Sequence, residues 1–433
     1  MKRISWLIAG LALAISGAPL AANAQTAKPK SVKIAIVTFF SGSGAVAGGP
    51  TVDSAKITVE GINKAGGIDG VPIEVQYVDE SGGSTKQVAE FRSLAGHVAA
   101  VIGYASSADC LAVEPVAEEL HVLTFFSDCD GDALYKGTAN EWIFHTIPSD
   151  ATNALAMAFY IAKMYPHIKT IAGINPDYAY GRDEWKYFTM AMQKLHPGVT
   201  LGTALFPALF SGQYTSELSR LQGERPDLIL SSTWGGDVVA LIQQGTALGS
   251  FGQSLFALPA GTEGGVEAMT AVPAGVVFGA EHGWLMHPGK IENPEIAAFV
   301  EEYHKQTHHY PVSPYPFTIQ RPIFSLVAGY QAAIKANGGH WPSADEVARA
   351  LVGVHVTTML GSFEIRSDHV ATVPEMDGVT VRSSSYPFSV LNKIIEFPAS
   401  MLMAPVGESE ESWIGKLTPA SLANVPAPKE YQP

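Results

Sequence analysis

The sequence lacks long apolar runs outside its first 20 residues. A helix that crosses a membrane needs about 20 consecutive apolar residues, so no span is expected after the N-terminal segment. Positive charge is also scarce, because 27 Lys and Arg stand against 41 Asp and Glu, a formal net charge of −14. An acidic surface repels phosphate backbones, so we expect no nucleic-acid partner.

The motifs of common catalytic and cofactor sites are missing as well. There is no G-x-S-x-G and no P-loop. Gly42-x-Gly44-x-x-x-Gly48 misses the dinucleotide-binding spacing. His304 and His308 lie four residues apart but lack the Glu of H-E-x-x-H, so a solvated helix face is favoured over a metal site. We therefore expect no enzyme, no cofactor and no metal. A hydrolase is the disfavoured alternative.

The N-terminal segment, residues 1–24, has the build of a secretory signal peptide. Two basic residues precede an apolar stretch that ends at Leu20, and Ala22-Asn-Ala24 offers small residues at a cleavage site. The alternative is a membrane anchor, for which the stretch is short. No cysteine follows it, which excludes a lipid anchor there. We expect cleavage and a periplasmic location.

Cysteine occurs only twice, at Cys110 and Cys129. An even pair in an oxidising compartment indicates a disulfide. Two unrelated buried thiols are the alternative.

What the sequence does contain is a repeated alternation of strands and helices. The first part predicts strands near 32–36, 71–77, 99–102 and 122–126, and helices from Thr51, near 85–97 and near 111–120. The alternation restarts after Asp150, with helices at 153–164, 181–195, 214–222 and 237–248 and strands at 170–174, 200–206, 227–231, 254–258 and near 275–279. Further helices are expected at 294–307, 321–337 and 343–352.

This pattern predicts an α/β protein with two Rossmann-like lobes, each a doubly wound parallel sheet. We expect residues 25–149 plus 280–359 in the N-terminal lobe, and 150–279 plus 360–433 in the C-terminal lobe. The Pro-rich tail is expected to run as a strap across one lobe. Ligands of such sheets bind beyond the carboxyl ends of the strands, which places the site in the cleft between the lobes.

Several segments resemble the branched-chain amino acid-binding proteins of ABC importers. They are Gly-Ile-Asn-Lys-Ala-Gly-Gly-Ile-Asp-Gly (61–70), Val-Ile-Gly-Tyr-Ala-Ser-Ser (101–107), Tyr-Ala-Tyr-Gly (178–181) and Gly-Ser-Phe-Glu-Ile-Arg-Ser-Asp-His (361–369). The resemblance covers about residues 31–370. It implies the type I periplasmic binding protein fold, with three crossovers between the lobes. It also implies a small polar ligand, such as an amino acid, an amide or an aromatic carboxylate, and permease subunits as partners of a monomer.

The resemblance places ligand contacts on residues that follow strands: Ser106, Ser107, Phe126, Ser127, Asp128, Tyr178, Tyr180, Trp234 and Glu263. Hydroxyls and free N–H groups at the helix start after Gly103 suit a carboxylate. Aromatic rings suit the body of a ligand. Alternatives stay open, because the two serines can instead cap the helix and Asp128 and Asp130 can be solvated loop residues.

The sequence departs from the family at the position of an acid that holds the ligand's ammonium group. The loop reads Phe256-Ala-Leu-Pro-Ala-Gly261, so Ala260 stands in the acid's place, and Glu263 is a candidate substitute. We therefore expect a ligand with an amine, an amide or several hydroxyls rather than an ordinary branched-chain amino acid. The predicted mechanism is hinge closure over a captured solute. The alternative is a periplasmic sensing receptor for a signalling partner.

Overall fold

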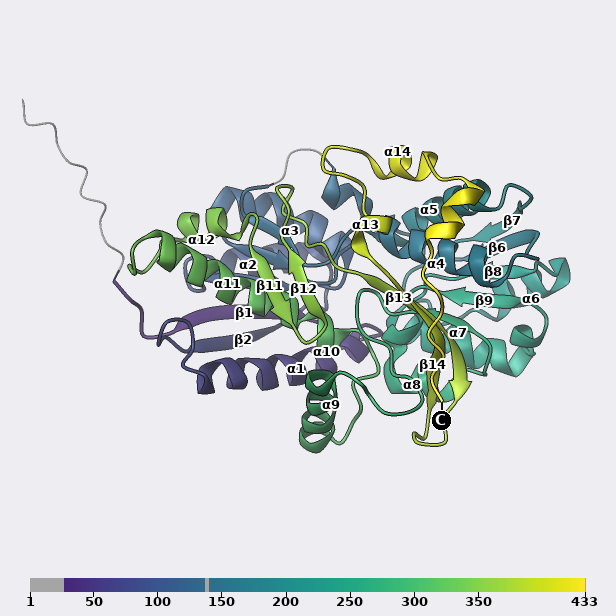
Figure 1. Cartoon of the computed structure of the whole chain (residues 1–433), viewed down its shortest axis with the longest axis horizontal. Helices are drawn as coiled ribbons and strands as arrows, with labels where there is room; N and C mark the ends of the chain where they lie inside the picture. The colour runs from purple at the N-terminus through teal and green to yellow at the C-terminus, as the bar shows by residue number, and fades with distance from the viewer. Residues whose placement is uncertain (1–26, 137–139, 433) are drawn as a thin grey trace, which may run out of the picture.

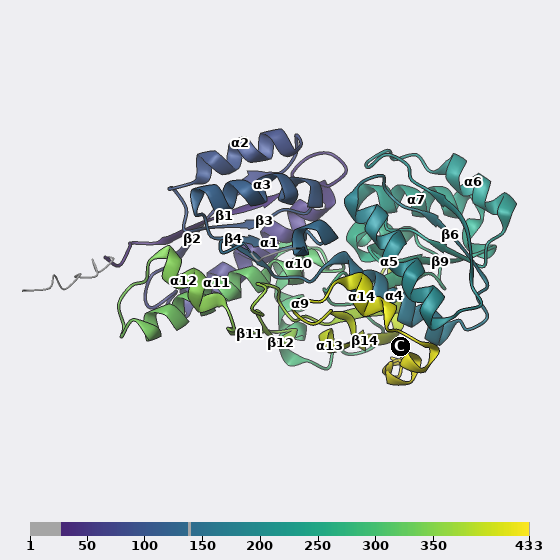
Figure 2. The same cartoon turned by 90° about the horizontal axis from the view of Figure 1, so that it is seen from above.

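The chain forms two α/β lobes that lie side by side (Figures 1 and 2). The structure, a computed structural model, describes residues 27–136 and 140–432. The predicted signal peptide, residues 1–24, lies outside these residues. No helix in the described part is both long enough and apolar enough to cross a membrane.

The first lobe is built on a five-stranded parallel sheet in the order β2-β1-β3-β4-β5. Its strands are β1 (Val32–Thr38), β2 (Ile73–Asp79), β3 (Ala100–Gly103), β4 (Thr124–Phe126) and β5 (Ile143–His145). One face carries α2 (Ser84–Leu94) and α3 (Ser107–Leu120). The other carries α1 (Ala45–Lys64), α11 (Gln320–Ala336), α12 (Ala344–Leu351) and the hairpin of β11 (His355–Thr358) and β12 (Gly361–Glu364).

The second lobe is built on a seven-stranded sheet in the order β14-β13-β10-β9-β8-β6-β7. Its parallel strands are β6 (Thr170–Ile174), β7 (Thr200–Leu205), β8 (Leu228–Leu230), β9 (Leu255–Leu258) and β10 (Val277–Gly279). Two antiparallel strands, β13 (Glu375–Arg382) and β14 (Ser389–Phe397), extend it. Two helices, α4 (Asp150–Met164) and α5 (Ala179–Leu195), cover one face. The other face carries α6 (Thr215–Glu224), α7 (Gly235–Leu248), α8 (Gly265–Ala271) and α9 (Pro294–Thr307).

The chain passes between the lobes three times: between β5 and α4, between β10 and α10 (Tyr315–Thr318), and between β12 and β13. The predicted fold class, two Rossmann-like lobes with three crossovers, is confirmed. Most predicted elements lie within a few residues of the observed ones. The sequence analysis missed β5, which has only three residues and therefore shows no periodicity.

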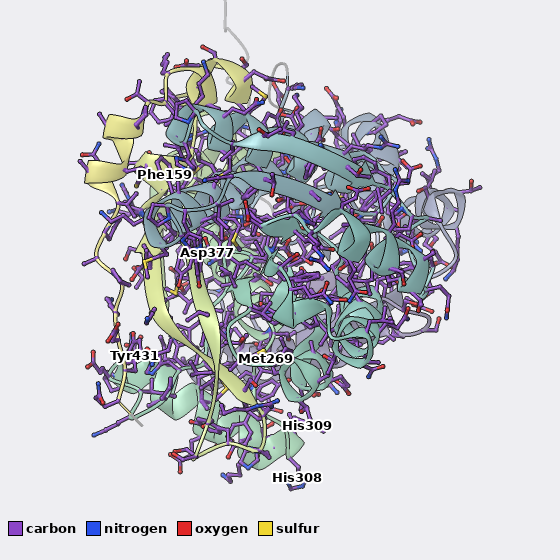
Figure 3. All side chains as sticks on the ribbon, turned by 90° about the vertical axis from the view of Figure 1, so that its right-hand side faces the viewer. Phe159, Met269, His308, His309, Asp377 and Tyr431 are labelled. Atoms are coloured by element: carbon purple, nitrogen blue, oxygen red, sulfur yellow. A yellow bond between two sulfur atoms is a disulfide. The ribbon has the colours of Figure 1, made fainter. Side chains whose placement is uncertain are left out.

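The tail after β14 runs along the second lobe, from near Phe159 towards Tyr431 (Figure 3). It is not simply extended, because it contains α13 (Ala399–Leu402), α14 (Glu410–Gly415) and the 3-10 turn η4 (Pro419–Asn424). Leu402, Ile414 and Val425 bury their side chains in the core that α4 and α5 share. The tail is thus part of the second lobe's packing.

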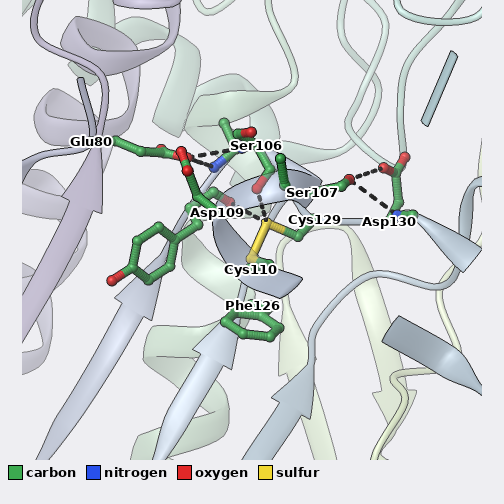
Figure 4. Close-up of a disulfide and its surroundings, with 12 residues drawn as sticks. Glu80, Ser106, Ser107, Asp109, Cys110, Phe126, Cys129 and Asp130 are labelled. Carbon is green, nitrogen blue, oxygen red and sulfur yellow. Dashed lines mark hydrogen bonds between the residues drawn. A yellow bond between two sulfur atoms is a disulfide. The ribbon is translucent and has the colours of Figure 1, made fainter. Parts of the chain in front are cut away.

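The two cysteines form a disulfide that ties the start of α3 to the loop after β4 (Figure 4). Replacing Cys110 and Cys129 together with alanine is expected to lower the free energy of unfolding by about 3 kcal/mol. The cysteines are 19 positions apart, and a bridge across a loop of that size restricts the unfolded chain by about this amount. Urea denaturation of the double variant measures the loss. Reduced wild-type protein serves as the control, and a loss below about 1 kcal/mol would contradict the prediction.

Candidate functional site

A small cavity, open to solvent on one side, lies between the lobes. Three lining residues come from the first lobe: Ala105, Asp128 and Asp130. The other five follow strands of the second lobe's sheet: Tyr178, Tyr180, Trp234, Glu263 and Glu281. Every lining residue therefore lies beyond the carboxyl end of a parallel strand. The doubly wound topology predicts this location, because helices occupy both faces of each sheet.

Two of the backbone N–H groups just before α3 are not free, contrary to our expectation. The carboxylate of Glu80 accepts hydrogen bonds from the N–H of Ala105 at 3.0 Å and of Ser106 at 2.9 Å. Glu80 is completely buried, and burial raises its pKa to about 8 although these N–H groups oppose the rise. The protein's own side chain thus binds two of the donors that the sequence analysis assigned to a ligand carboxylate.

Ser107 is also engaged within the protein (Figure 4). Its hydroxyl donates to Asp130 at 3.4 Å and accepts from the N–H of Gly131 at 3.1 Å. Neither Ser106 nor Ser107 lines the cavity, and both are buried. The two predicted serines therefore organise the wall behind the cavity, on the side of the first lobe.

Phe126 and Ser127 do not line the cavity either. Phe126 is fully buried and packs edge-on against Tyr104, with ring centroids 6.2 Å apart. It therefore belongs to the first lobe's core. Ser127 is buried beside it, and its N–H donates to the Gly103 carbonyl.

Of the predicted contacts, five do line the cavity: Asp128, Tyr178, Tyr180, Trp234 and Glu263. One carboxylate oxygen from each of Asp128, Glu263 and Glu281 lies within 4.8 Å of the other two. Burial and the neighbouring carboxylates raise the pKa of Asp128 and of Glu263 well above the usual value. The site therefore concentrates acidic groups from both sides of the cavity.

The aromatic part of the lining is a connected wall. The indole N–H of Trp234 donates to the Tyr178 hydroxyl at 2.9 Å, and the rings of Tyr178 and Tyr180 lie 5.9 Å apart. Behind Trp234 stand Phe210, at 5.0 Å between ring centroids, and Phe39, at 6.2 Å. These contacts hold the indole in place, so the wall is rigid.

Glu281 reaches the cavity through an unusual backbone conformation. Both Glu281 and His282 have positive φ angles, 42° and 60°, and this conformation costs a non-glycine residue about 1–3 kcal/mol. The His282 N–H donates to Glu375 at 2.6 Å, and its carbonyl accepts from Arg321. The Tyr180 hydroxyl donates to Glu281 at 2.6 Å. A clamp of residues from three distant segments thus orients the Glu281 carboxylate.

The sequence analysis missed Glu281 although a signal existed, since it follows β10 as the other lining residues follow their strands. Asp130 was weighed against a loop role and lines the cavity. Glu80 also follows a strand, β2, but β1 separates β2 from β3, after which its target N–H groups lie. Arg321 comes from helix α11 and carried no such signal. The positions of both therefore depend on how strands and lobes pack.

Comparison with known proteins places this geometry in a family. The family described as "Periplasmic binding protein" matches residues 31–385. A solute-binding protein of an ABC transporter from R. palustris, solved in complex with benzoate, superposes with a TM-score of 0.73 at 17% identity, over 88% of this chain and 98% of that one. The leucine-, isoleucine-, valine-, threonine- and alanine-binding protein of Brucella ovis, in a closed conformation, gives 0.70 at 20% identity over 88% and 98%.

A curated relative is the Leu/Ile/Val-binding protein homolog 3 of Brucella melitensis biotype 1. It is 28% identical over 165 residues, which cover 38% of this chain. The matched stretch spans 44% of that relative's length.

Proposed function

The chain belongs to the periplasmic binding protein family, and on that premise we propose that it captures a small polar solute between its lobes for an ABC importer. The observation that carries the proposal is the cavity lined from both lobes. A solute bound there contacts both lobes at once, so it stabilises the closed arrangement relative to an open one.

The proposal places the mature protein in the periplasm, delivered by the expected signal peptide. It acts as a monomer, and its partners are permease subunits that recognise the closed shape. Its task is binding without turnover, which agrees with the missing catalytic motifs in the sequence.

The contact between the lobes shows which groups closure brings together. The N–H of Gly236, at the start of α7, donates to the carbonyl of Ser43 at 2.9 Å. A Cβ atom on Gly236 would lie 3.1 Å from that carbonyl oxygen. Glycine therefore permits the close approach of α7 to the first-lobe loop.

We expect Gly236→Ala to weaken solute binding about fivefold, because the added methyl group opposes closure by about 1 kcal/mol. Isothermal titration with wild-type and variant protein measures this, with leucine, benzoate, acetamide and 1,4-diaminobutane as first probes. The free energy of unfolding should not fall, because alanine is the better helix former by about 0.5–1 kcal/mol.

Gly223→Ala is the matched control. Gly223 also lies in a helix, α6, and a Cβ there meets nothing within 4 Å. It should raise stability similarly and leave affinity unchanged. Small-angle scattering with each bound probe tests closure itself. Binding without any reduction in the radius of gyration would contradict hinge closure.

A further inference from the structure

The interlobe cavity gathers more acidic groups than nearby positive charge can balance. Its lining includes four carboxylates, those of Asp128, Asp130, Glu263 and Glu281. Among the described residues, the one buried Lys or Arg side chain is Arg321, which does not line the cavity, donates to a backbone carbonyl and acts through its charge on one of the four acids, Asp128. Uncompensated buried charge is costly, so the group that belongs in this cavity carries positive charge.

The cavity lining carries no positive charge that would hold an anion. Glu80 also binds the N–H groups of Ala105 and Ser106, just before α3. The Ser107 hydroxyl donates to Asp130. A solute carboxylate would therefore meet the four acidic side chains without the donors that it needs.

An unsatisfied hydroxyl points to an occupant at the same place. Tyr315 is 2% exposed, and its hydroxyl lies beside the carboxyl of Glu263, although the two make no hydrogen bond of standard geometry. A donor that reaches both the carboxylates and this hydroxyl would satisfy all of them.

The aromatic wall distinguishes between the cations that fit. Metal ions such as Ca²⁺ take six to eight oxygen ligands and gain nothing from ring carbons. An organic ammonium gains from both, because its N–H groups bond to carboxylates and its charge and carbon chain are attracted to aromatic rings. The three carboxylates within 4.8 Å of one another match the three N–H groups of a primary ammonium.

We propose that the solute of this cavity is a small organic cation that bears a primary ammonium group and no carboxylate. The ammonium is held by Asp128, Glu263 and Glu281, and its carbon chain lies against Tyr178, Tyr180 and Trp234. A second positive charge, as in a short diamine, is favoured by Asp130. This inference rests on the proposed function and differs from it in naming the class of solute.

Isothermal titration of the mature protein with 1,4-diaminobutane and 4-aminobutanoate tests the proposal. Both probes have four carbons and an ammonium at one end. At the other end the fourth carbon bears a second ammonium in 1,4-diaminobutane and is the carboxylate carbon in 4-aminobutanoate. The diamine should bind at least about 100-fold more tightly, since the carboxylate would be buried among acids. Equal or tighter binding of 4-aminobutanoate, or of leucine, would overturn the proposal.

Glu263→Gln is the informative variant, with Glu267→Gln as its control. Glu267 is exposed, lies in α8 shortly after Glu263 in the sequence, and does not line the cavity. Glu263→Gln should weaken diamine binding about tenfold or more, yet raise the melting temperature of the ligand-free protein because one of several like charges is gone. Glu267→Gln should change neither. If Glu263→Gln left diamine affinity intact, the proposal would fail.

Asp128→Asn, a variant in the first lobe, should weaken diamine binding in the same way. Agreement between the two variants would exclude a folding defect in one of them as the explanation. Calcium chloride is titrated separately, and binding of calcium with no binding of the diamine would overturn the proposal in favour of a metal site. Small-angle scattering distinguishes the proposed function from the proposed class of solute. Closure on leucine or benzoate alone would keep the proposed function and reject the cationic solute, whereas diamine binding without closure would keep the site and reject the hinge mechanism.

Discussion

Arg321→Met is expected to lower the free energy of unfolding by about 3–5 kcal/mol, because removing one partner leaves buried charge uncompensated. The guanidinium of Arg321 is 2% exposed and donates to the carbonyl of His282. Burial lowers the pKa of Arg321 to about 10, while the charges of Glu375 and Asp128 oppose the fall. Glu375 in turn accepts from the His282 N–H. The variant therefore loosens the clamp that carries Glu281.

Urea denaturation near pH 7 measures the effect, and Arg220→Met is the control. The side chain of Arg220 is 61% exposed and pairs with Glu224 on the same helix, so its loss should cost less than about 0.5 kcal/mol. The penalty of Arg321→Met should shrink at pH 5, because Asp128, whose pKa burial and the charges of Glu281 and Asp130 raise, then binds a proton instead. A loss below 1 kcal/mol at pH 7 would show that the buried guanidinium does not compensate these acids.

The ligand-free protein should lose stability as the pH rises from about 5 to 8. The pKa of Glu80 is raised to about 8 by burial, with smaller contributions from the charges of Asp109 and Asp79. In the unfolded chain this carboxyl titrates near its usual value of about 4.3. The folded state therefore binds one more proton between the two values. Stability is then complete below the unfolded pKa and declines as pH rises towards the folded one.

The expected loss from Glu80 alone is on the order of 3 kcal/mol over this range, since each extra bound proton contributes about 1.4 kcal/mol per pH unit. Asp128, Asp130 and Glu263, whose pKa values are raised in the same direction, add to it. Urea denaturation at pH 5, 6.5 and 8 gives the slope.

Glu80→Gln isolates the contribution of Glu80. An amide at this position does not titrate, so the free energy of unfolding of the variant should depend less steeply on pH. Relative to wild type, the variant should therefore be most stable at pH 8. Glu74→Gln, an exposed position on the same strand, should leave the slope unchanged. A wild-type stability that rises from pH 5 to 8 would contradict the prediction, as would an unchanged slope in Glu80→Gln.

The two predictions have a common origin in the acidic interior near the cavity. Buried carboxylates are stable when they are protonated, paired or bound by N–H donors. Asp150 and Glu184 have neither oxygen bonded within the described residues, and burial beside other acids raises the pKa of both. These clustered carboxyl groups lower the free energy of unfolding of the ligand-free protein. A cationic solute that binds the folded state would raise it again.

The fold was readable from the sequence because it depends on local signals. Apolar residues at helical spacing, ended by cap and turn residues, predicted α9 at the bounds that the structure shows, 294–307. A short apolar run predicted β6 equally well. The alternation of strands and helices then implied parallel sheets, which leaves ligands only the carboxyl ends of strands.

The family resemblance placed Tyr180, Trp234 and Glu263 at the site, and this rule agrees, since each follows a strand of the same sheet. The rule could not predict that Glu80 binds the N–H groups just before α3. Glu80 reaches Ser106 because β2, β1 and β3 lie in one sheet in that order, and strand order is a tertiary property. Arg321 and Ser43 meet the second lobe only through the packing of one lobe on the other.

The sequence by itself determined the two-lobed frame and the edge on which a site must lie, because periodicity and turns act over a few residues. Only the tertiary structure decided that Glu281 joins the acids at this edge and that Glu80 binds the N–H groups of Ala105 and Ser106. Those contacts join residues whose separation along the chain says nothing about their distance in space.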